Sequence, residues 1–378
     1  MIQRIKALSL DTVNKIAAGE VVERPASVIK ELLENSIDAQ SNNINITLSD
    51  AGKKLISVRD NGTGIVPEDI ELAFQRHTTS KIQNSEDLFE IHTLGFRGEA
   101  LSAIASVSRL TAVSKNKDHE YGTSIYIEFG NIRSKDKKAG STGTTIIVED
   151  LYSNTPARLK FLKTSSTELS HCINMVNNYA TAYPTISFSL EHNNKTILSY
   201  DRTSNFEDRI RSIYGKDDKW LTKNSAYEYV SGELYIKDPS KFSEKTDFKI
   251  FINGRAVKDR VCAHALSSAF QKHLSSGTAP ACVLFLNIET AFVDMNVSPT
   301  KNEVRFRESN LIHSFIQSLV DLTLKKDSGP TKNTFNNTKT PAYKNDIEYS
   351  KPSENISLFD ELYGQTNTEQ NLGINILG

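Results

Sequence analysis

The stretch from Pro25 to Asp38 most constrains the fold of this chain, because it predicts one amphipathic helix with an acidic polar face. Three acids and an amide recur at steps of three and four residues on that face: Glu31, Glu34, Asn35 and Asp38. Apolar residues recur at the same steps on the opposite face: Ile29, Leu32, Leu33 and Ile37. Pro25 suits the first helical turn, where a missing N–H has no cost. The pattern therefore predicts a helix that lies on a sheet.

The polar face of this helix allows two interpretations. Most acidic stripes are solvated helix faces, and composition alone favours that interpretation. Asn35 favours a functional one, because an amide carbonyl oxygen beside carboxylates suits a hard cation and a water molecule that needs a base. The choice depends on whether the rest of the chain supplies a nucleotide site.

Two strands follow the helix. Residues 43–48 alternate between polar and apolar side chains, and residues 54–60 return as a second strand after a turn. In the second strand Ile56, Val58 and Asp60 point to the same side. A carboxylate thus emerges on the apolar side, where it needs a hydrogen-bond donor.

A glycine-containing turn comes directly after Asp60. Gly62 and Gly64 allow positive φ and the close approach of a flat ligand, although a plain turn has the same composition. Residues 67–76 then predict a short helix with proline and acids in its first turn.

Residues 77–98 lack periodicity and predict a long loop, which in a compact domain tends to be functional or disordered. Gly98 opens an apolar helix over residues 100–105, so free backbone N–H groups lie beside flexible glycines. That arrangement suits a phosphate chain. It is neither the Gly-x-x-x-x-Gly-Lys-Ser/Thr loop nor a dinucleotide-binding turn.

The whole chain predicts two α/β domains, over residues 1–200 and 201–330, and a flexible linker over residues 331–378. Helical segments between residues 156 and 179 accompany the further strands of the first domain, which are 107–114, 123–129, 143–149, 185–191 and 195–200. In the second domain the predicted helices are 206–214, 258–274 and 309–325. Its predicted strands are 227–236, 247–252 and 281–288.

Composition excludes several classes of protein. The 45 basic and 46 acidic residues give a net charge of -1, so any nucleic-acid contact must use a local groove. Cys172, Cys262 and Cys282 are far apart and have no His partner at metal-ligand spacing, which predicts buried or incidental thiols in a reducing cytosol. No window is apolar enough for a signal peptide or a membrane span, so we expect a cytoplasmic protein with no membrane partner.

Several motifs together identify a family resemblance. Four features stand in one order: Glu31 with Asn35, Asp60 with Gly62 and Gly64, Gly95 to Leu101, and Gly143-Thr144-Thr145. Together they resemble the GHKL ATPase superfamily, which includes topoisomerase ATPase subunits, the ninety-kilodalton heat-shock chaperone and sensor histidine kinases. Three longer motifs are similar to its MutL family of DNA mismatch repair proteins: IAAGEVVERP from Ile16, GFRGEAL from Gly95 and NTPAR from Asn154.

The resemblance covers about residues 5–325. It implies an α+β fold, with a GHKL (Bergerat-type) ATPase α/β sandwich on a mixed sheet and a second, smaller α/β domain with a βαβ core. The implied activity is slow, magnesium-dependent hydrolysis of ATP to ADP and phosphate.

The resemblance also implies roles for individual residues. Glu31 matches the general base that activates the attacking water, and Asn35 matches the magnesium ligand. Asp60 matches the carboxylate that accepts a hydrogen bond from the adenine amino group, and Lys301 matches a second-domain lysine that reaches the γ-phosphate. The other implied nucleotide-binding positions are Asp38, Gly62, Gly64, Thr79, Ser80, Lys81, Leu94, Gly95, Phe96, Arg97, Gly98, Glu99, Ala100, Leu101 and Thr144.

The resemblance further implies a switch whose ATP state drives homodimerisation and couples a MutS-type mismatch sensor to a downstream nuclease or helicase. Arg260 matches a DNA-contacting arginine, so weak and non-specific DNA binding in a local groove is expected. The family carries a C-terminal dimerisation domain after the linker, and we expect this chain to be truncated before it. The stretch from Asn355 to Phe359 resembles a peptide that docks on the sliding clamp, although such matches often arise by chance.

Two other functions remain open. One is an ATP-gated scaffold that recruits partners and whose hydrolysis is dispensable. The other is the ATPase subunit of a topoisomerase-like GHKL protein, although GFRGEAL and NTPAR fit that class poorly. A histidine kinase is disfavoured, since its phosphoacceptor helices precede the Asn motif and only about thirty residues do so here.

Overall fold

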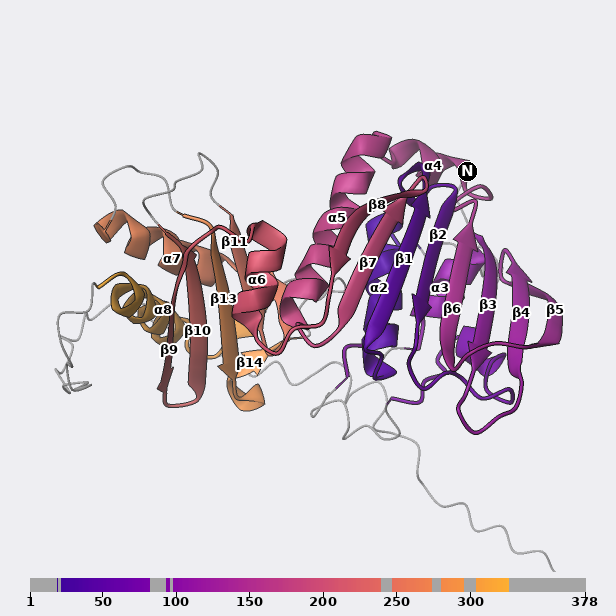
Figure 1. Ribbon diagram of the computed structural model, residues 1–378, viewed down its shortest axis with the longest axis horizontal. Helices are drawn as coiled ribbons and strands as arrows, with labels where there is room; N and C mark the ends of the chain where they lie inside the picture. The colour runs from indigo at the N-terminus through magenta and orange to yellow at the C-terminus, as the bar shows by residue number, and fades with distance from the viewer. Residues whose placement is uncertain are drawn as a thin grey trace, which may run out of the picture. The chain divides into compact units, whose positions relative to one another are not determined.

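The structure is a computed structural model. It describes residue 19 and residues 22–81, 93–95, 98–238, 247–273, 280–295 and 304–325. These residues form an α+β fold with two large sheets, of eight and five strands, and one small pair of strands (Figure 1). The predicted fold class is therefore confirmed.

The larger sheet runs in the order β5-β4-β3-β6-β2-β1-β7-β8. Its strands are β1 (Asn43–Ser49), β2 (Leu55–Asp60), β3 (Arg109–Lys115), β4 (Gly122–Glu128), β5 (Asn131–Lys138), β6 (Gly143–Glu149), β7 (Ser187–His192) and β8 (Lys195–Tyr200). β1 pairs in parallel with β7 and antiparallel with β2, so the sheet is mixed as predicted.

One face of the larger sheet is covered by α2 (Pro25–Asp38), α3 (Ala100–Ser106) and α5 (Ser165–Ala182), and a short helix, α4 (Pro156–Phe161), precedes α5. α2 has the predicted bounds, with Pro25 in its first turn. Ile29, Leu32 and Leu33 are at most 2% exposed. Burial of each such side chain contributes about 1.5–3 kcal/mol, which holds α2 on the sheet.

The smaller sheet runs in the order β12-β11-β13-β10-β9. Its strands are β9 (Trp220–Tyr227), β10 (Val230–Lys237), β11 (Phe248–Ile252), β12 (Arg255–Val257) and β13 (Cys282–Ile288), and β14 (Val293–Asp294) pairs with β15 (Arg305–Phe306) outside it. β12 and α7 (Arg260–His273) lie between β11 and β13 in the chain, and β11 pairs in parallel with β13, which confirms the predicted βαβ core.

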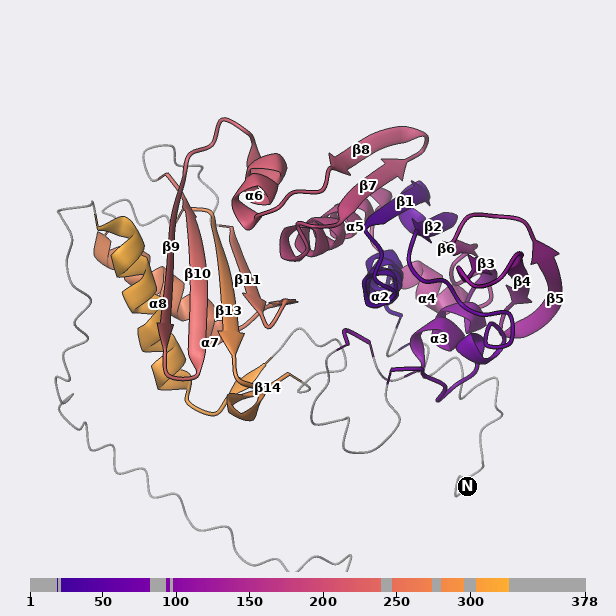
Figure 2. The same ribbon diagram turned by 60° about the horizontal axis from the view of Figure 1, so that its bottom comes forward.

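Helices cover both faces of the smaller sheet. α7 and α8 (Ser309–Leu324) lie side by side on one face (Figure 2) and share a core with Leu234, Ile250 and Leu284. α6 (Phe206–Tyr214) buries Ile210 against the opposite face, next to Phe251. Each face of β11 therefore packs on a different core.

Three parts of the secondary structure differ from the prediction. Residues 67–76 form turns and one 3-10 helix, η2 (Leu72–Phe74), because only Ile70 and Phe74 are buried there and a helix this short needs more packing. The strand predicted over residues 227–236 corresponds to β10, which begins at Val230, and the preceding strand β9 was not predicted; a turn at Glu228, whose φ is 50°, separates the two. β5 was not predicted at all, because all its residues are exposed and the strand shows no alternation.

The three cysteines are free and buried, as predicted. Burial raises the pKa of Cys172 to about 12, so its thiol is not a nucleophile at neutral pH. Among the described residues no helix is long and apolar enough to cross a membrane.

Candidate nucleotide site

A cavity of about 1630 Å³ follows the polar face of α2. Its lining includes Glu31, Asn35 and Asp38 of α2, and Asp60 from the end of β2. The smaller sheet contributes a basic part of the lining, Lys249, Arg255 and Lys258. The cavity thus brings together residues that are more than 200 positions apart in the sequence.

Asp60 is placed by strand parity, as expected. Ile56 and Val58 are at most 2% exposed, and Asp60 follows them on the side that faces α2, where Ser36 Oγ donates to its Oδ2 at 3.1 Å. Its Oδ1 accepts from the backbone N–H groups of Gly62 at 2.8 Å and Thr144 at 3.2 Å. Burial nevertheless raises the pKa of Asp60, since desolvation outweighs these hydrogen bonds. The result is an oriented carboxylate at the cavity wall.

The two glycines after Asp60 have different reasons to be glycine. Gly64 has a φ of +71°, and a side chain there would collide with the Lys115 carbonyl oxygen. Gly62 does not have a positive φ, but a Cβ on it would lie 2.6 Å from the Ala39 carbonyl oxygen. Thr144 Oγ1 is 2.8 Å from Ser114 Oγ, which holds β6 and β3 together beside this turn.

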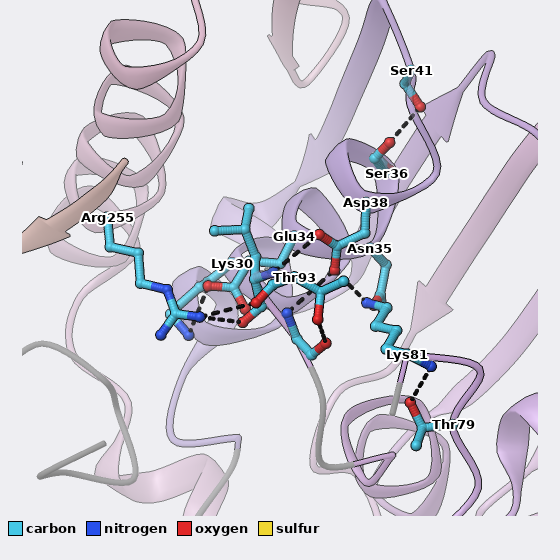
Figure 3. Close-up of polar contacts among 12 residues, drawn as sticks. Lys30, Glu34, Asn35, Ser36, Asp38, Ser41, Thr79, Lys81, Thr93 and Arg255 are labelled. Atoms are coloured by element: carbon cyan, nitrogen blue, oxygen red, sulfur yellow. Dashed lines mark hydrogen bonds and ion pairs between the residues drawn. The ribbon is translucent and has the colours of Figure 1, made fainter. Parts of the chain in front are cut away.

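The last turn of α2 is arranged around an ammonium group (Figure 3). Lys81 Nζ donates to Asn35 Oδ1 at 2.8 Å and lies 2.5 Å from Asp38 Oδ2. Thr79 Oγ1 accepts from the Lys81 backbone N–H at 3.1 Å, which orders this turn. Two hard oxygen atoms from one helix already converge on a positive charge. The donor set therefore fits magnesium, which usually takes few protein ligands and completes its shell with water and phosphate.

Asp38 also anchors the segment before the predicted triphosphate loop. Its Oδ1 accepts from the Leu94 N–H at 3.0 Å and its Oδ2 from the Gly95 N–H at 3.2 Å. From the smaller sheet, Arg255 donates to the carbonyl oxygens of Thr93 at 3.0 Å and Leu94 at 3.4 Å. Asp38 of α2 and Arg255 of β12 thus both bind Leu94.

Gly98 and α3 complete the described part of the loop. Gly98 has a φ of +61°, and a side chain there would collide with the Thr78 carbonyl oxygen. Glu99 lies against His77, with 3.2 Å between Oε1 and Nδ1. α3 begins at Ala100, as the sequence predicts.

Glu31 is held from within α2. Lys30 Nζ lies 3.0 Å from Glu31 Oε1 and 3.3 Å from Glu34 Oε1. Tyr179 of α5 donates to the same Glu34 oxygen at 2.7 Å. Glu34 is 3% exposed, so the alternative interpretation of a solvated helix face does not hold at this position.

Most predicted site residues lie together, and several fall outside the described part of the chain. The cavity is lined by Glu31, Asn35, Asp38, Asp60, Gly64, Thr79, Ser80, Lys81, Leu94, Gly95, Gly98, Glu99, Ala100, Leu101 and Thr144. Gly62 lies beside it through Asp60. Arg260 is exposed at the start of α7 and is not in the lining. The residues outside the described ranges are Phe96, Arg97, Lys301 and the stretch from Asn355 to Phe359.

Sequence reasoning missed Lys30, Tyr179, Ser36 and Arg255. Lys30 and Glu34 are four residues apart, which is the spacing of helical ion pairs and a signal that could have been used. Tyr179 and Arg255 carry no such signal, because their partners are 145 and 162 residues away.

Two family models match the chain. Residues 23–155 match the histidine kinase-, DNA gyrase B- and HSP90-like ATPase family, and residues 210–325 match the C-terminal domain family of DNA mismatch repair proteins. The DNA mismatch repair protein MutL of Neisseria meningitidis is 45% identical over 318 residues, which cover 83% of this chain and 48% of that protein. The chain belongs to the MutL family.

Other relatives agree with this membership. MutL of Halothermothrix orenii is 42% identical over 330 residues, which cover 86% of this chain and 51% of that protein. The chain therefore spans about half the length of the MutL proteins it matches. The sequence identity to MutL proteins does not favour the alternative of a topoisomerase ATPase subunit.

Solved structures show the same fold. The N-terminal domain of a DNA repair protein has a TM-score of 0.69 and 27% identity, with 82% of this chain and 97% of that one covered. The Aquifex aeolicus MutL ATPase domain complexed with ADP has a TM-score of 0.59 and 24% identity, with 82% and 100% covered. The similarity to the Aquifex aeolicus domain is evidence for the fold alone.

Proposed function

We propose that this chain is the ATP-binding and ATP-hydrolysing part of a cytoplasmic DNA mismatch repair protein. One observation carries the proposal: an oriented carboxylate, Asp60, and a cation-binding pair, Asn35 and Asp38, line one cavity. Asp60 supplies an acceptor for the adenine amino group. Asn35 and Asp38 supply oxygen atoms where the phosphates need a cation.

The proposed chemistry uses α2 for two tasks. Glu31 lies one helical turn before Asn35, so a base and a cation ligand face the same part of the cavity. Glu31 accepts a proton from the attacking water and holds that water in line. Asn35 would hold magnesium, with Lys81 displaced from the amide oxygen. A bound magnesium ion would offset the negative charge that develops on the phosphate oxygens.

Other residues complete the proposed nucleotide site. Lys301 adds positive charge at the γ-phosphate, as the family resemblance implies. Gly95 and the residues from Gly98 to Leu101 line the cavity where the triphosphate would lie, and Gly64 also lines this cavity. The contacts of Arg255 with Thr93 and Leu94 support a coupling between nucleotide binding and the smaller sheet.

We propose that the ATP state switches partner binding. ATP binding draws both sheets onto the nucleotide and drives homodimerisation, and slow hydrolysis reverses it. The dimer couples a MutS-type mismatch sensor to a downstream nuclease or helicase and contacts DNA weakly through a groove that includes Arg260. Membership of the MutL family and the position of Arg260 on an exposed helix start support this role.

The proposal is tested by two variants of the purified chain. Glu31→Ala should keep ATP binding and lose turnover, since the base acts only in the reaction. Asp60→Ala should weaken binding itself. Binding is measured by titration calorimetry with a non-hydrolysable ATP analogue, and turnover by phosphate release with magnesium. Normal turnover in Glu31→Ala would refute the mechanism.

A further inference from the structure

Lys30 occupies an unusual position on α2. Neighbouring residues of a helix point in different directions, yet Lys30 Nζ lies 3.0 Å from Glu31 Oε1. The ammonium group reaches this carboxylate because Glu34, four residues on, attracts it from the same face at 3.3 Å. The Lys30 and Glu31 side chains are 13% and 18% exposed, so water screens this pair only weakly.

Glu34 is fixed in turn by α5. Its side chain is 4% exposed, and its Oε1 accepts the Tyr179 hydroxyl at 2.7 Å. Burial raises the pKa of Tyr179 well above its usual value, and the Glu34 carboxylate acts in the same direction. Tyr179 therefore keeps its proton and donates at every pH near neutrality.

The charge of Lys30 persists in this environment. Burial alone lowers the pKa of the ammonium group, but Glu31 and Glu34 outweigh burial and raise it. One ammonium group is thus shared between two carboxylates, and the three together carry a net charge of one negative unit.

We propose that Lys30 is a positioning residue for Glu31, anchored by Glu34 and Tyr179, and that this inference rests on the proposed ATPase function. Lys30 holds Oε1 of Glu31, so the carboxylate presents its other oxygen to the attacking water. A general base needs this fixed geometry, because a misplacement of about 1 Å costs up to about a hundredfold in rate. Lys30 itself touches no reacting atom.

The test separates turnover from affinity in the full 378-residue chain. Lys30→Met should lower the turnover of magnesium ATP by about 10- to 100-fold, because Glu31 loses its fixed orientation. The dissociation constant of a non-hydrolysable ATP analogue should stay within about threefold, since the proposed contacts with the base and the phosphates come from other residues. Lys30→Arg should restore most of the turnover, because a guanidinium group can also bridge two carboxylates.

A second variant changes Tyr179, which binds Glu34 and so acts on Lys30 only indirectly. Tyr179→Phe removes only one hydroxyl group, so it keeps the packing of α5 and should lower turnover a few-fold without loss of affinity. Lys195→Met changes an exposed lysine on β8 and is the matched control with unchanged turnover and affinity. Circular dichroism and thermal unfolding of each variant show whether it folds.

Each outcome decides the matter. Wild-type turnover in Lys30→Met, or loss of turnover and analogue affinity together in both Lys30→Met and Tyr179→Phe, overturns the positioning role. Failure of Lys30→Arg to restore turnover while affinity stays intact also overturns it. A wild-type chain that neither binds nor hydrolyses ATP overturns the proposed function, and the inference with it.

Discussion

Replacement of Asp60 by Asn should weaken the contact with adenine while it leaves the fold intact. Asp60 Oδ1 accepts two backbone N–H groups, from Gly62 and Thr144, and an Asn carbonyl oxygen can accept both in the same place. The NH2 group of Asn then replaces Oδ2 and faces Ser36, whose hydroxyl can rotate to accept. The internal contacts persist, but an adenine amino group in the cavity loses its charged acceptor.

The expected loss of affinity follows from that one contact. A hydrogen bond to a charged acceptor contributes about 1.5–3 kcal/mol. Since about 1.4 kcal/mol corresponds to a factor of ten, Asp60→Asn should weaken ADP binding by about 10- to 100-fold. In this variant the side-chain NH2 group and the adenine amino group are both donors that face each other. The loss of ADP affinity should therefore lie toward the upper end of this range.

The same variant should change how stability depends on pH. The pKa of Asp60 is raised by burial above its usual value of 3.8. A carboxyl group whose folded pKa is raised contributes stability that is complete below the unfolded pKa and is lost as pH rises through the folded pKa. Asn does not titrate, so the stability of Asp60→Asn relative to wild type should increase as pH rises from below 3.8 to neutrality.

The assay is titration calorimetry with ADP and magnesium, together with denaturant unfolding at several pH values. Asp136→Asn changes an exposed carboxylate on β5 and is the matched control for the loss of one charge. Equal ADP affinity in Asp60→Asn and wild type would refute the assignment of Asp60. A stability difference that falls with rising pH would contradict the raised pKa.

Three further predictions concern other parts of the account. Leu33→Ala should lower the free energy of unfolding by about 2–5 kcal/mol, because the Leu33 side chain of α2 is fully buried in the core. Leu72→Ala, at a residue that is 46% exposed, should lower it by less than about 0.5 kcal/mol in the same denaturant experiment. Lys81→Met should make the nucleotide-free chain respond more strongly to magnesium in thermal unfolding, since the competing ammonium group is gone, and an unchanged response counts against the cation site. Arg260→Glu should weaken DNA binding and lower the slope of affinity against salt by about one, and an unaltered slope removes Arg260 from the DNA contacts.

The sequence predicts best the parts of the site that a single element carries. The bounds of α2 and the side from which Asp60 emerges follow from helical and strand periodicity, and both are confirmed. Most of the site residues that the family motifs identify also line the cavity. Here local pattern and tertiary placement agree, because the helix and strand bury their apolar faces on the same core.

Other parts of the structure lie beyond such patterns. β5 pairs through its backbone with β4 while every side chain faces solvent, so its sequence lacks the alternation of a half-buried strand. The burial of Glu34 depends on Tyr179, 145 residues away, and no spacing on α2 shows it. The same holds for Lys81, which reaches Asn35 from 46 residues away across a loop without periodicity.

A crystal structure of this chain with magnesium and a non-hydrolysable ATP analogue tests the central claim most directly. The account predicts the adenine amino group within hydrogen-bond distance of the Asp60 carboxylate, magnesium on Asn35 Oδ1, and Lys81 Nζ displaced from that oxygen. A nucleotide base bound away from Asp60, or Lys81 still paired with Asn35 while the phosphates lie elsewhere, would contradict it.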